Sequence, residues 1–193
     1  MKKTELVNYG KKVLIISTSL RGGSNSDILA NECAKGAKEV GHDVELLSLK
    51  GKDIKYCIGC LSCQRNGMCV LKDDVADIMA KVKDAEVIVY ATPIYYYEMC
   101  GQMKTLLDRL NPLYSTDYSF RDIYMIATAA ENDESAFEKA YNGLQGWVDC
   151  LEKTSLKGMV GGGIDAANRI PTNTHPQKQN AQDFLAIAGM ISD

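Results

Sequence analysis

The sequence has no long apolar run and no excess of basic residues. No apolar run reaches the roughly 18 residues that a membrane span requires, and the lysine-bearing start lacks the apolar core of a signal peptide. The 193 residues carry 22 Lys and Arg against 25 Asp and Glu, a formal net charge of -3. This balance argues against a basic nucleic-acid face. We therefore expect a cytoplasmic protein with neither a membrane nor a nucleic acid as its partner.

Cysteine is unusually frequent for such a chain. Four of the seven cysteines fall between residues 57 and 69. A secreted scaffold held by disulfides would be shorter, and its cysteines would be paired and spread along the chain. The crowding instead indicates metal or redox chemistry in a reducing compartment.

Apolar periodicity predicts strands alternating with helices, the pattern of an α/β domain with a parallel sheet. The predicted strands cover residues 13–16, 44–49, 86–91, 122–128 and 156–160. The predicted helices cover residues 28–40, 75–82, 99–110, 134–151 and 178–190. Five strands and five helices make a three-layer sandwich of one domain, residues 1–193. Ligands of such sheets bind outside the carboxyl ends of the strands.

The turn after the first strand, residues 17–26, is rich in hydroxyl groups. It also holds Arg21, Asn25 and two glycines at the start of a helix, where exposed N–H groups and the helix dipole attract anions. The turn matches neither the Walker loop nor the G-x-G-x-x-G fingerprint. It could hold a terminal monophosphate, or Ser24 or Ser26 could simply cap the helix.

The turn after the third strand carries three successive tyrosines, Tyr95 to Tyr97, behind Pro93. Proline stiffens the loop, and a rigid aromatic loop suits a flat ring ligand. The alternative is that these tyrosines pack under a helix or across a dimer interface.

Both turns resemble those of the flavodoxin-like, NAD(P)H-dependent FMN reductases. Residues 18–26, T-S-L-R-x-x-S-N-S, resemble that family's G-S-P-R-x-x-S-N-T phosphate loop. Residues 93–109, P-I-Y-Y-Y-x-x-C-G-Q-M-K-x-x-x-D-R, are similar to its P-I-Y-Y-Y-x-x-S-G-Q-x-K-x-x-x-D-R segment. Thr18, Leu20 and Cys100 depart from the family pattern.

The resemblance implies a flavodoxin-like sheet of order 2-1-3-4-5 that binds FMN. The FMN phosphate would lie among five residues of the first turn: Ser19, Arg21, Ser24, Asn25 and Ser26. Its isoalloxazine would rest on Pro93, Ile94, Tyr95 and Tyr96, with Thr128, Ala129 and Ala130 along another edge. No side chain need act as catalyst, because the flavin N5 accepts hydride. Family members are commonly dimers or tetramers. Lys104, Asp108 and Arg109 are expected to be structural or interface charges.

The four clustered cysteines lie in a cysteine-rich insertion, residues 50–73, which is far longer than an ordinary strand-to-helix loop. Structural zinc usually takes two separated C-x2-C pairs, whereas Cys57-x2-Cys60-x2-Cys63 has ferredoxin-type spacing and Cys69 follows locally. The motif resembles that of the iron–sulfur flavoproteins, which implies a [4Fe–4S] cluster. Free or redox-active thiols and zinc remain alternatives. Cys33 and Cys150 are predicted to be core residues.

These observations predict an FMN-dependent oxidoreductase. NAD(P)H would reduce the bound FMN. The electrons would then pass to a free flavin, a quinone or a similar small molecule, or they would leave through the cluster. An alternative is a flavin and iron–sulfur electron carrier that turns over no substrate and is reduced by a partner such as ferredoxin. A further alternative is a zinc-binding or thiol redox-sensing module.

Overall fold

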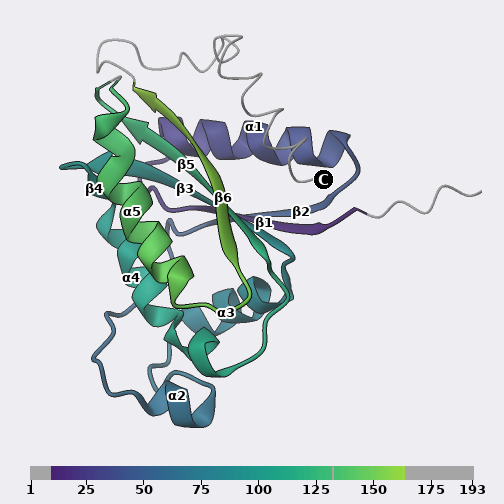
Figure 1. Ribbon diagram of the computed structural model, residues 1–193, viewed down its shortest axis with the longest axis vertical. Coiled ribbons are helices and arrows are strands. Elements are labelled where there is room, and N and C mark those ends of the chain that lie inside the picture. Colours follow the sequence, from purple (N-terminus) through teal and green to yellow (C-terminus); the bar gives the residue numbers. More distant parts are fainter. Residues whose placement is uncertain (1–9, 132, 164–193) are drawn as a thin grey trace, which may run out of the picture.

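The computed structural model describes residues 10–131 and 133–163, which contain one twisted sheet with helices on both faces (Figure 1). Five parallel strands lie in the order β2-β1-β3-β5-β6. Their bounds are β1 Lys12–Ser17, β2 Asp43–Ser48, β3 Val87–Tyr95, β5 Asp122–Ala129 and β6 Ser155–Gly163. Taken by themselves, these strands have the predicted 2-1-3-4-5 order. The predicted helix at residues 178–190 lies outside the described residues.

The sheet has a sixth strand that the sequence does not predict. Strand β4, Glu98–Met99, pairs antiparallel with the end of β3. Met99 therefore belongs to a strand, and the helix predicted over residues 99–110 is α4, Gly101–Arg109. A two-residue strand is too short to show a period-2 pattern.

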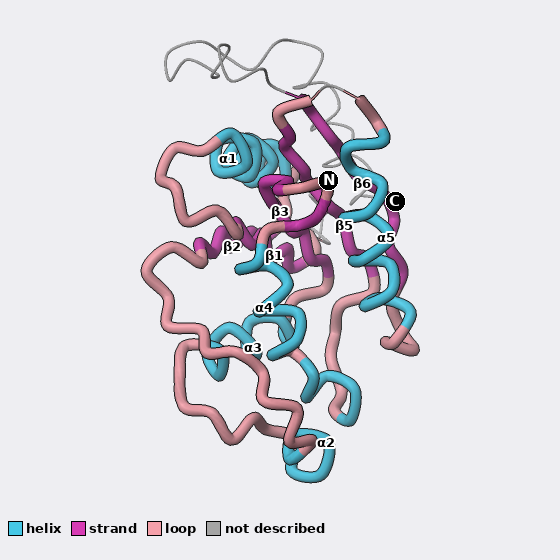
Figure 2. Tube along the Cα trace, turned by 90° about the vertical axis from the view of Figure 1, so that its left-hand side faces the viewer, coloured by secondary structure: helices cyan, strands magenta, loops and turns pink. Residues whose placement is uncertain are grey.

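Helices cover the two faces unequally (Figures 1 and 2). On one face α1, Asn25–Glu39, buries Leu29 and Cys33 against β1 and β3. On the other face lie α3, Val75–Asp84, α4 and α5, Ser135–Asp149. The predicted alternation of strands with amphipathic helices is thus confirmed for these elements. No helix among the described residues is long and apolar enough to cross a membrane.

The cysteine-rich insertion extends away from the sheet, beyond the C-terminal end of α4 (Figure 2). It contains the short helix α2, Ser62–Asn66, which packs against the 3-10 helix η1, Asn111–Ser115. Cys33 is fully buried, as predicted. The prediction for Cys150 is wrong: this thiol is exposed, because it lies off the buried face that Leu144, Val148 and Leu151 share.

Candidate functional site

The turn after β1 joins a set of hydroxyl groups to the first turn of α1. Ser24 is the N-cap of α1, and its Oγ accepts a hydrogen bond from the Asp27 amide over 3.2 Å. The Ser24 and Ser26 hydroxyls lie 3.1 Å apart, and Ser19 is buried in the same turn. Arg21 is exposed at the rim of the turn. The expected cap is therefore present, and further hydroxyls surround the positive end of a 15-residue helix.

Strands β3 and β4 form a hairpin with backbone strain at its tip. Tyr95 pairs with Glu98, and the two residues between them, Tyr96 and Tyr97, have φ of 52° and 66°. A two-residue hairpin turn of this kind normally carries Asn-Gly, because positive φ crowds an L side chain. Strained backbone of this sort is concentrated at functional sites. The side chain of Tyr96 is 98% exposed at this tip.

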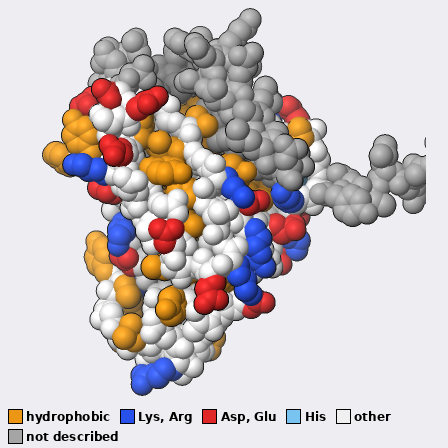
Figure 3. All heavy atoms as spheres, in the orientation of Figure 1, with side chains coloured by type: hydrophobic (Ala, Val, Ile, Leu, Met, Phe, Trp, Pro, Cys, Tyr) orange, Lys and Arg blue, Asp and Glu red, His pale blue; other side chains and the backbone are white. Residues whose placement is uncertain are grey.

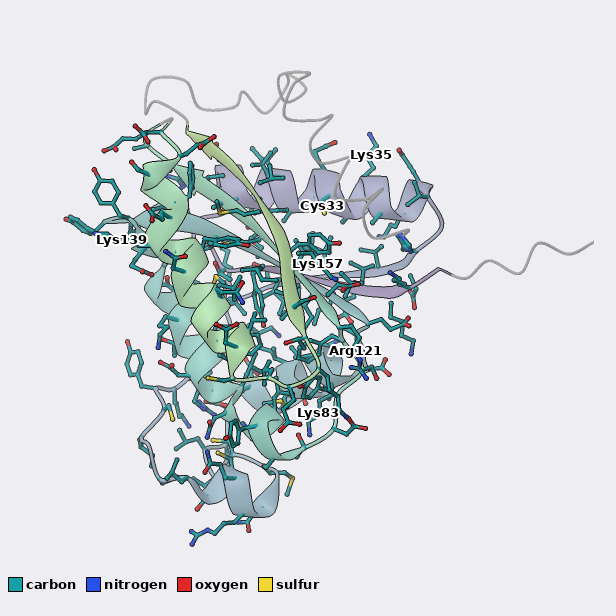
Figure 4. All side chains as sticks on the ribbon, in the orientation of Figure 1. Cys33, Lys35, Lys83, Arg121, Lys139 and Lys157 are labelled. Carbon is teal, nitrogen blue, oxygen red and sulfur yellow. The ribbon has the colours of Figure 1, made fainter. Side chains whose placement is uncertain are left out.

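The hairpin is attached to the loop after β5. The Tyr97 hydroxyl donates to the Glu131 carboxylate over 3.1 Å, which raises the pKa of Tyr97. The ammonium of Lys139, which extends from α5 (Figure 4), lies 5.6 Å from the centre of the Tyr97 ring. A hollow of about 190 Å³ lies between the two loops. It is lined by Ile94, Tyr96, Tyr97, Ala129, Ala130, Glu131 and Ala136. The structure thus brings together residues predicted on two separate turns.

Cys100 joins the turn after β1 to the hairpin. It is buried, its amide donates to Thr92 Oγ1 over 3.2 Å, and its sulfur lies 3.2 Å from Thr18 Oγ1. Thr18 in turn donates to the Ala91 carbonyl over 2.9 Å. The thiol therefore makes polar contacts at the position where the FMN reductase pattern has serine.

The four clustered cysteines line one cavity of about 490 Å³ at the far end of α4. Cys57 and Cys60 are exposed, Cys69 is half-buried and Cys63 is buried. Exposed hydrophobic side chains lie on the same part of the chain, and orange side chains, the colour of hydrophobic residues and cysteine, gather in the lower part of Figure 3. These side chains are Tyr56, Ile58, Leu61, Met68, Val70 and Tyr114.

Two nitrogen donors face the sulfurs of this cavity. Asn111 Nδ2 donates to Cys63 Sγ over 3.0 Å, and the Gly59 amide approaches Cys57 Sγ at 3.5 Å. Cys150, at the end of α5, is a fifth thiol in the wall. All of the cysteines are free, and within the described residues no three His, Cys, Asp or Glu side chains are gathered around a position for one metal ion.

Residues 11–142, more than half of the chain, match the family described as NADPH-dependent FMN reductase. The chain belongs to this family. It is 38% identical over 102 residues to an iron-sulfur flavoprotein of Methanocaldococcus jannaschii, a match covering 53% of each chain. It is 33% identical over 102 residues to an iron-sulfur flavoprotein of Archaeoglobus fulgidus, covering 53% of this chain and 46% of that one. The chain thus spans about half the length of these curated relatives.

Solved structures of the same fold include flavin and quinone enzymes. The NAD(P)H:quinone oxidoreductase of Methanothermobacter marburgensis superposes with a TM-score of 0.65 at 13% identity, covering 93% of this chain and 98% of that one. An FMN-dependent NADH-azoreductase of Bacillus anthracis, solved with FMN, gives 0.65 at 18% identity, covering 95% and 100%. At these identities the likeness concerns the fold, which is flavodoxin-like in this member of the family.

Two residues of these sites, Glu131 and Asn111, are not predicted from the sequence. Neither belongs to a recognisable motif, because each makes its contact with a residue distant in sequence. Arg109 was expected to be structural, and it is: its side chain is buried and paired with Asp73. Lys104 and Asp108 form an exposed i,i+4 ion pair at 2.6 Å.

Proposed function

We propose that this chain is an FMN-dependent oxidoreductase that takes hydride from NAD(P)H and passes electrons to a small acceptor of the flavin or quinone class. The observation that supports this function is the convergence of three loops at the carboxyl edge of the sheet. These are the hydroxyl-rich turn after β1, the strained β3–β4 hairpin and the loop after β5. Family membership supplies the class of cofactor.

The turn after β1 suits the phosphate of FMN. Ser19, Ser24 and Ser26 are buried yet retain hydroxyl groups that can donate, and they stand at the N-terminal end of α1. Arg21 and Asn25 lie at the edge of this turn and would supply a cation and an amide. We therefore assign Ser19, Arg21, Ser24, Asn25 and Ser26 to the phosphate.

The hairpin and the loop after β5 suit the isoalloxazine ring. Pro93, Ile94, Tyr95 and Tyr96 would support one side of the ring. Thr128, Ala129 and Ala130 would border it at the end of β5. Bound FMN would itself accept the hydride, so the chain's task is to orient the ring and exclude water around it.

The cysteine cavity suits a cluster with one thiolate for each iron. Cys57, Cys60, Cys63 and Cys69 are unpaired thiols around one cavity, and N–H donors already face two of the sulfurs. Such donors stabilise thiolate ligands and influence the potential of the metal. We propose a [4Fe–4S] cluster here, which would give electrons a one-electron exit. The names of the relatives agree with this assignment.

We further propose that the protein acts in a reducing compartment such as the cytoplasm, as a homodimer or homotetramer. Reducing conditions keep clustered thiols from forming disulfides. The 98% exposed ring of Tyr96, together with Tyr95 beside it, is the kind of aromatic surface that subunit interfaces bury.

Anaerobic purification followed by flavin, iron and sulfide analysis tests this function. We expect a yellow protein that binds FMN, is reduced by NADH or NADPH, and contains iron and sulfide. Failure of FMN to bind on reconstitution would refute the oxidoreductase assignment. Reduction by ferredoxin but by neither nucleotide would show an electron carrier instead, and zinc without iron would show a zinc module.

A further inference from the structure

The base of the cysteine-rich insertion is held by a compact set of contacts. We call it the neck: residues 53–55 on the entering side, residues 72–74 on the leaving side, and Arg109 between them. The Asp53 amide donates to Asp74 Oδ2 over 2.8 Å, and the Asp74 amide donates to the Asp53 carbonyl over 3.0 Å. Lys55 Nζ donates to the Lys72 carbonyl over 2.8 Å. The two ends of the insertion are therefore joined directly to each other.

Arg109 binds both sides of the neck from the last residue of α4. Its Nη1 donates to the Lys55 carbonyl over 2.6 Å and to Asp73 Oδ2 over 2.5 Å, and its Nη2 donates to Asp73 Oδ1 over 3.0 Å. Asp73 Oδ2 also accepts from the Lys55 amide over 2.9 Å. The side chains of Arg109 and Asp73 are 1% and 0% exposed, so this forked pair is a buried one.

Hydrogen bonds keep the carboxyl group of Asp73 ionised although its side chain is buried. Burial tends to raise the pKa of Asp73, but the hydrogen bonds from Arg109, Lys55 and Val75 outweigh it, and the net shift is downward. Both groups are therefore charged at neutral pH. Removing one member of a buried pair leaves the other charge without compensation, which is a large penalty.

The guanidinium of Arg109 also contacts one residue on each side of the cysteine motif in the sequence. The Lys55 carbonyl that it binds lies two residues before Cys57, and Asp73 lies four residues after Cys69. The Arg109 Nε is buried without a hydrogen-bond partner among the described atoms. Burial lowers the pKa of Arg109, but the hydrogen bonds to Asp73 outweigh it, so the pKa is raised. Arg109 thus joins the two chain segments that flank the cysteine motif.

We propose that Arg109, through the neck, is a positioning residue that holds the cysteine-rich insertion in a closed loop before any metal binds. The inference rests on the proposed cluster for its purpose but on the neck contacts for its geometry. Cysteines at the ends of an unfastened segment of this length would have to be ordered by the metal itself, at the expense of affinity. If the neck is already closed, the segment loses less conformational entropy when the metal binds, so the affinity for the metal is higher.

Hydrogen exchange on the iron-free, full-length protein tests the closed neck. The variants are Asp73→Asn and Arg109→Lys, which keep side-chain size while removing the charge or the fork. We expect amides of residues 56–72 to exchange faster by roughly a hundredfold in both, with β1, β3 and β5 unchanged. The matched control is Lys104→Met, which breaks the exposed ion pair with Asp108 on the same helix and should leave residues 56–72 as in wild type.

A second measurement asks whether the neck positions the ligands. With limiting ferrous iron and sulfide under anaerobic conditions, the two neck variants should take up at least about tenfold less iron per chain than wild type and Lys104→Met, at unchanged FMN binding. Wild-type exchange rates at residues 56–72 in both variants would overturn the proposal. An opened loop that still loads iron as wild type does would also overturn it. If wild type itself takes up no iron, the proposed cluster fails, and the exchange experiment still decides whether the neck is closed.

Discussion

The sulfur of Cys100 lies 3.2 Å from the hydroxyl of Thr18, and this contact joins two turns that are 82 residues apart in sequence. One turn carries the hydroxyls assigned to the FMN phosphate, and the other leads into the hairpin assigned to the ring. The two halves of the proposed flavin site therefore meet at one buried side chain.

Replacing Cys100 should alter FMN binding according to what the new side chain can contact. Cys100→Ser retains a polar group at this position and should bind FMN about as tightly as wild type. Cys100→Ala leaves Thr18 and Thr92 without this partner and should weaken FMN binding by about tenfold, measured by flavin fluorescence quenching. Cys33→Ala, which removes another buried thiol, on the sheet-facing side of α1, is the control and should leave the affinity unchanged. Equal affinity in Cys100→Ala and wild type would contradict the assignment.

Relieving the strain at the hairpin tip should stabilise the protein. Tyr96→Asn places a residue that tolerates positive φ at a position where tyrosine does not, and should raise the free energy of unfolding by about 1 kcal/mol. The same change removes the exposed ring proposed to contact the isoalloxazine, so turnover should fall while stability rises. Urea unfolding and steady-state NAD(P)H oxidation measure the two effects. Tyr95→Asn, at a neighbouring residue without positive φ, should not be stabilised; if it gains as much as Tyr96→Asn, strain is not the cause.

Thiol-specific alkylation of the iron-free native protein should divide the cysteines by burial. Cys57, Cys60 and Cys150 are exposed and should react with iodoacetamide at least about a hundredfold faster than Cys33 and Cys100. Peptide mass spectrometry after timed quenching assigns each rate. If Cys150 reacted as slowly as Cys33, it would be buried after all, as the sequence predicts.

Stability at alkaline pH should depend on Cys33. Burial between α1 and the sheet raises the pKa of this thiol from 9.0 to about 12, so the folded state holds its proton more tightly than the unfolded state does. The resulting stabilisation is complete below pH 9 and is lost as the pH rises toward 12. Relative to Cys33→Ala, the wild type should therefore lose about 1.4 kcal/mol per pH unit over this range. Denaturant unfolding at several pH values from 8 to 10.5 gives this difference, and parallel pH dependences of the two proteins would contradict it.

The sequence is sufficient to predict the parallel sheet and most of its helices. Buried strands such as β1 show as short, continuous apolar runs, and α1 and α5 show helical periodicity with clear ends. The hydroxyl-rich turn and the cysteine motif are also visible, because each depends on residues adjacent in sequence.

Features made by distant contacts could not be predicted in this way. Asp73 and Arg109 are 36 residues apart, and nothing in the sequence near either residue indicates that they form an ion pair. The turn at Tyr96 and Tyr97 carries no glycine or asparagine, so no local signal marks the reversal of the chain. Cys150 lies between the buried Val148 and Leu151 in sequence but off the face that these two residues share.

Helix α4 begins directly after Cys100, at the proposed flavin site, and ends at Arg109, in the neck. Its nine residues form a rigid rod about 13.5 Å long, so one element sets the spacing between the two proposed redox centres of a chain. Inserting one alanine in its middle would turn Arg109 by about 100° away from Asp73 and displace it by about 1.5 Å. The number of residues in α4 is therefore as much a part of the proposed electron-transfer apparatus as the cysteines and tyrosines at its ends.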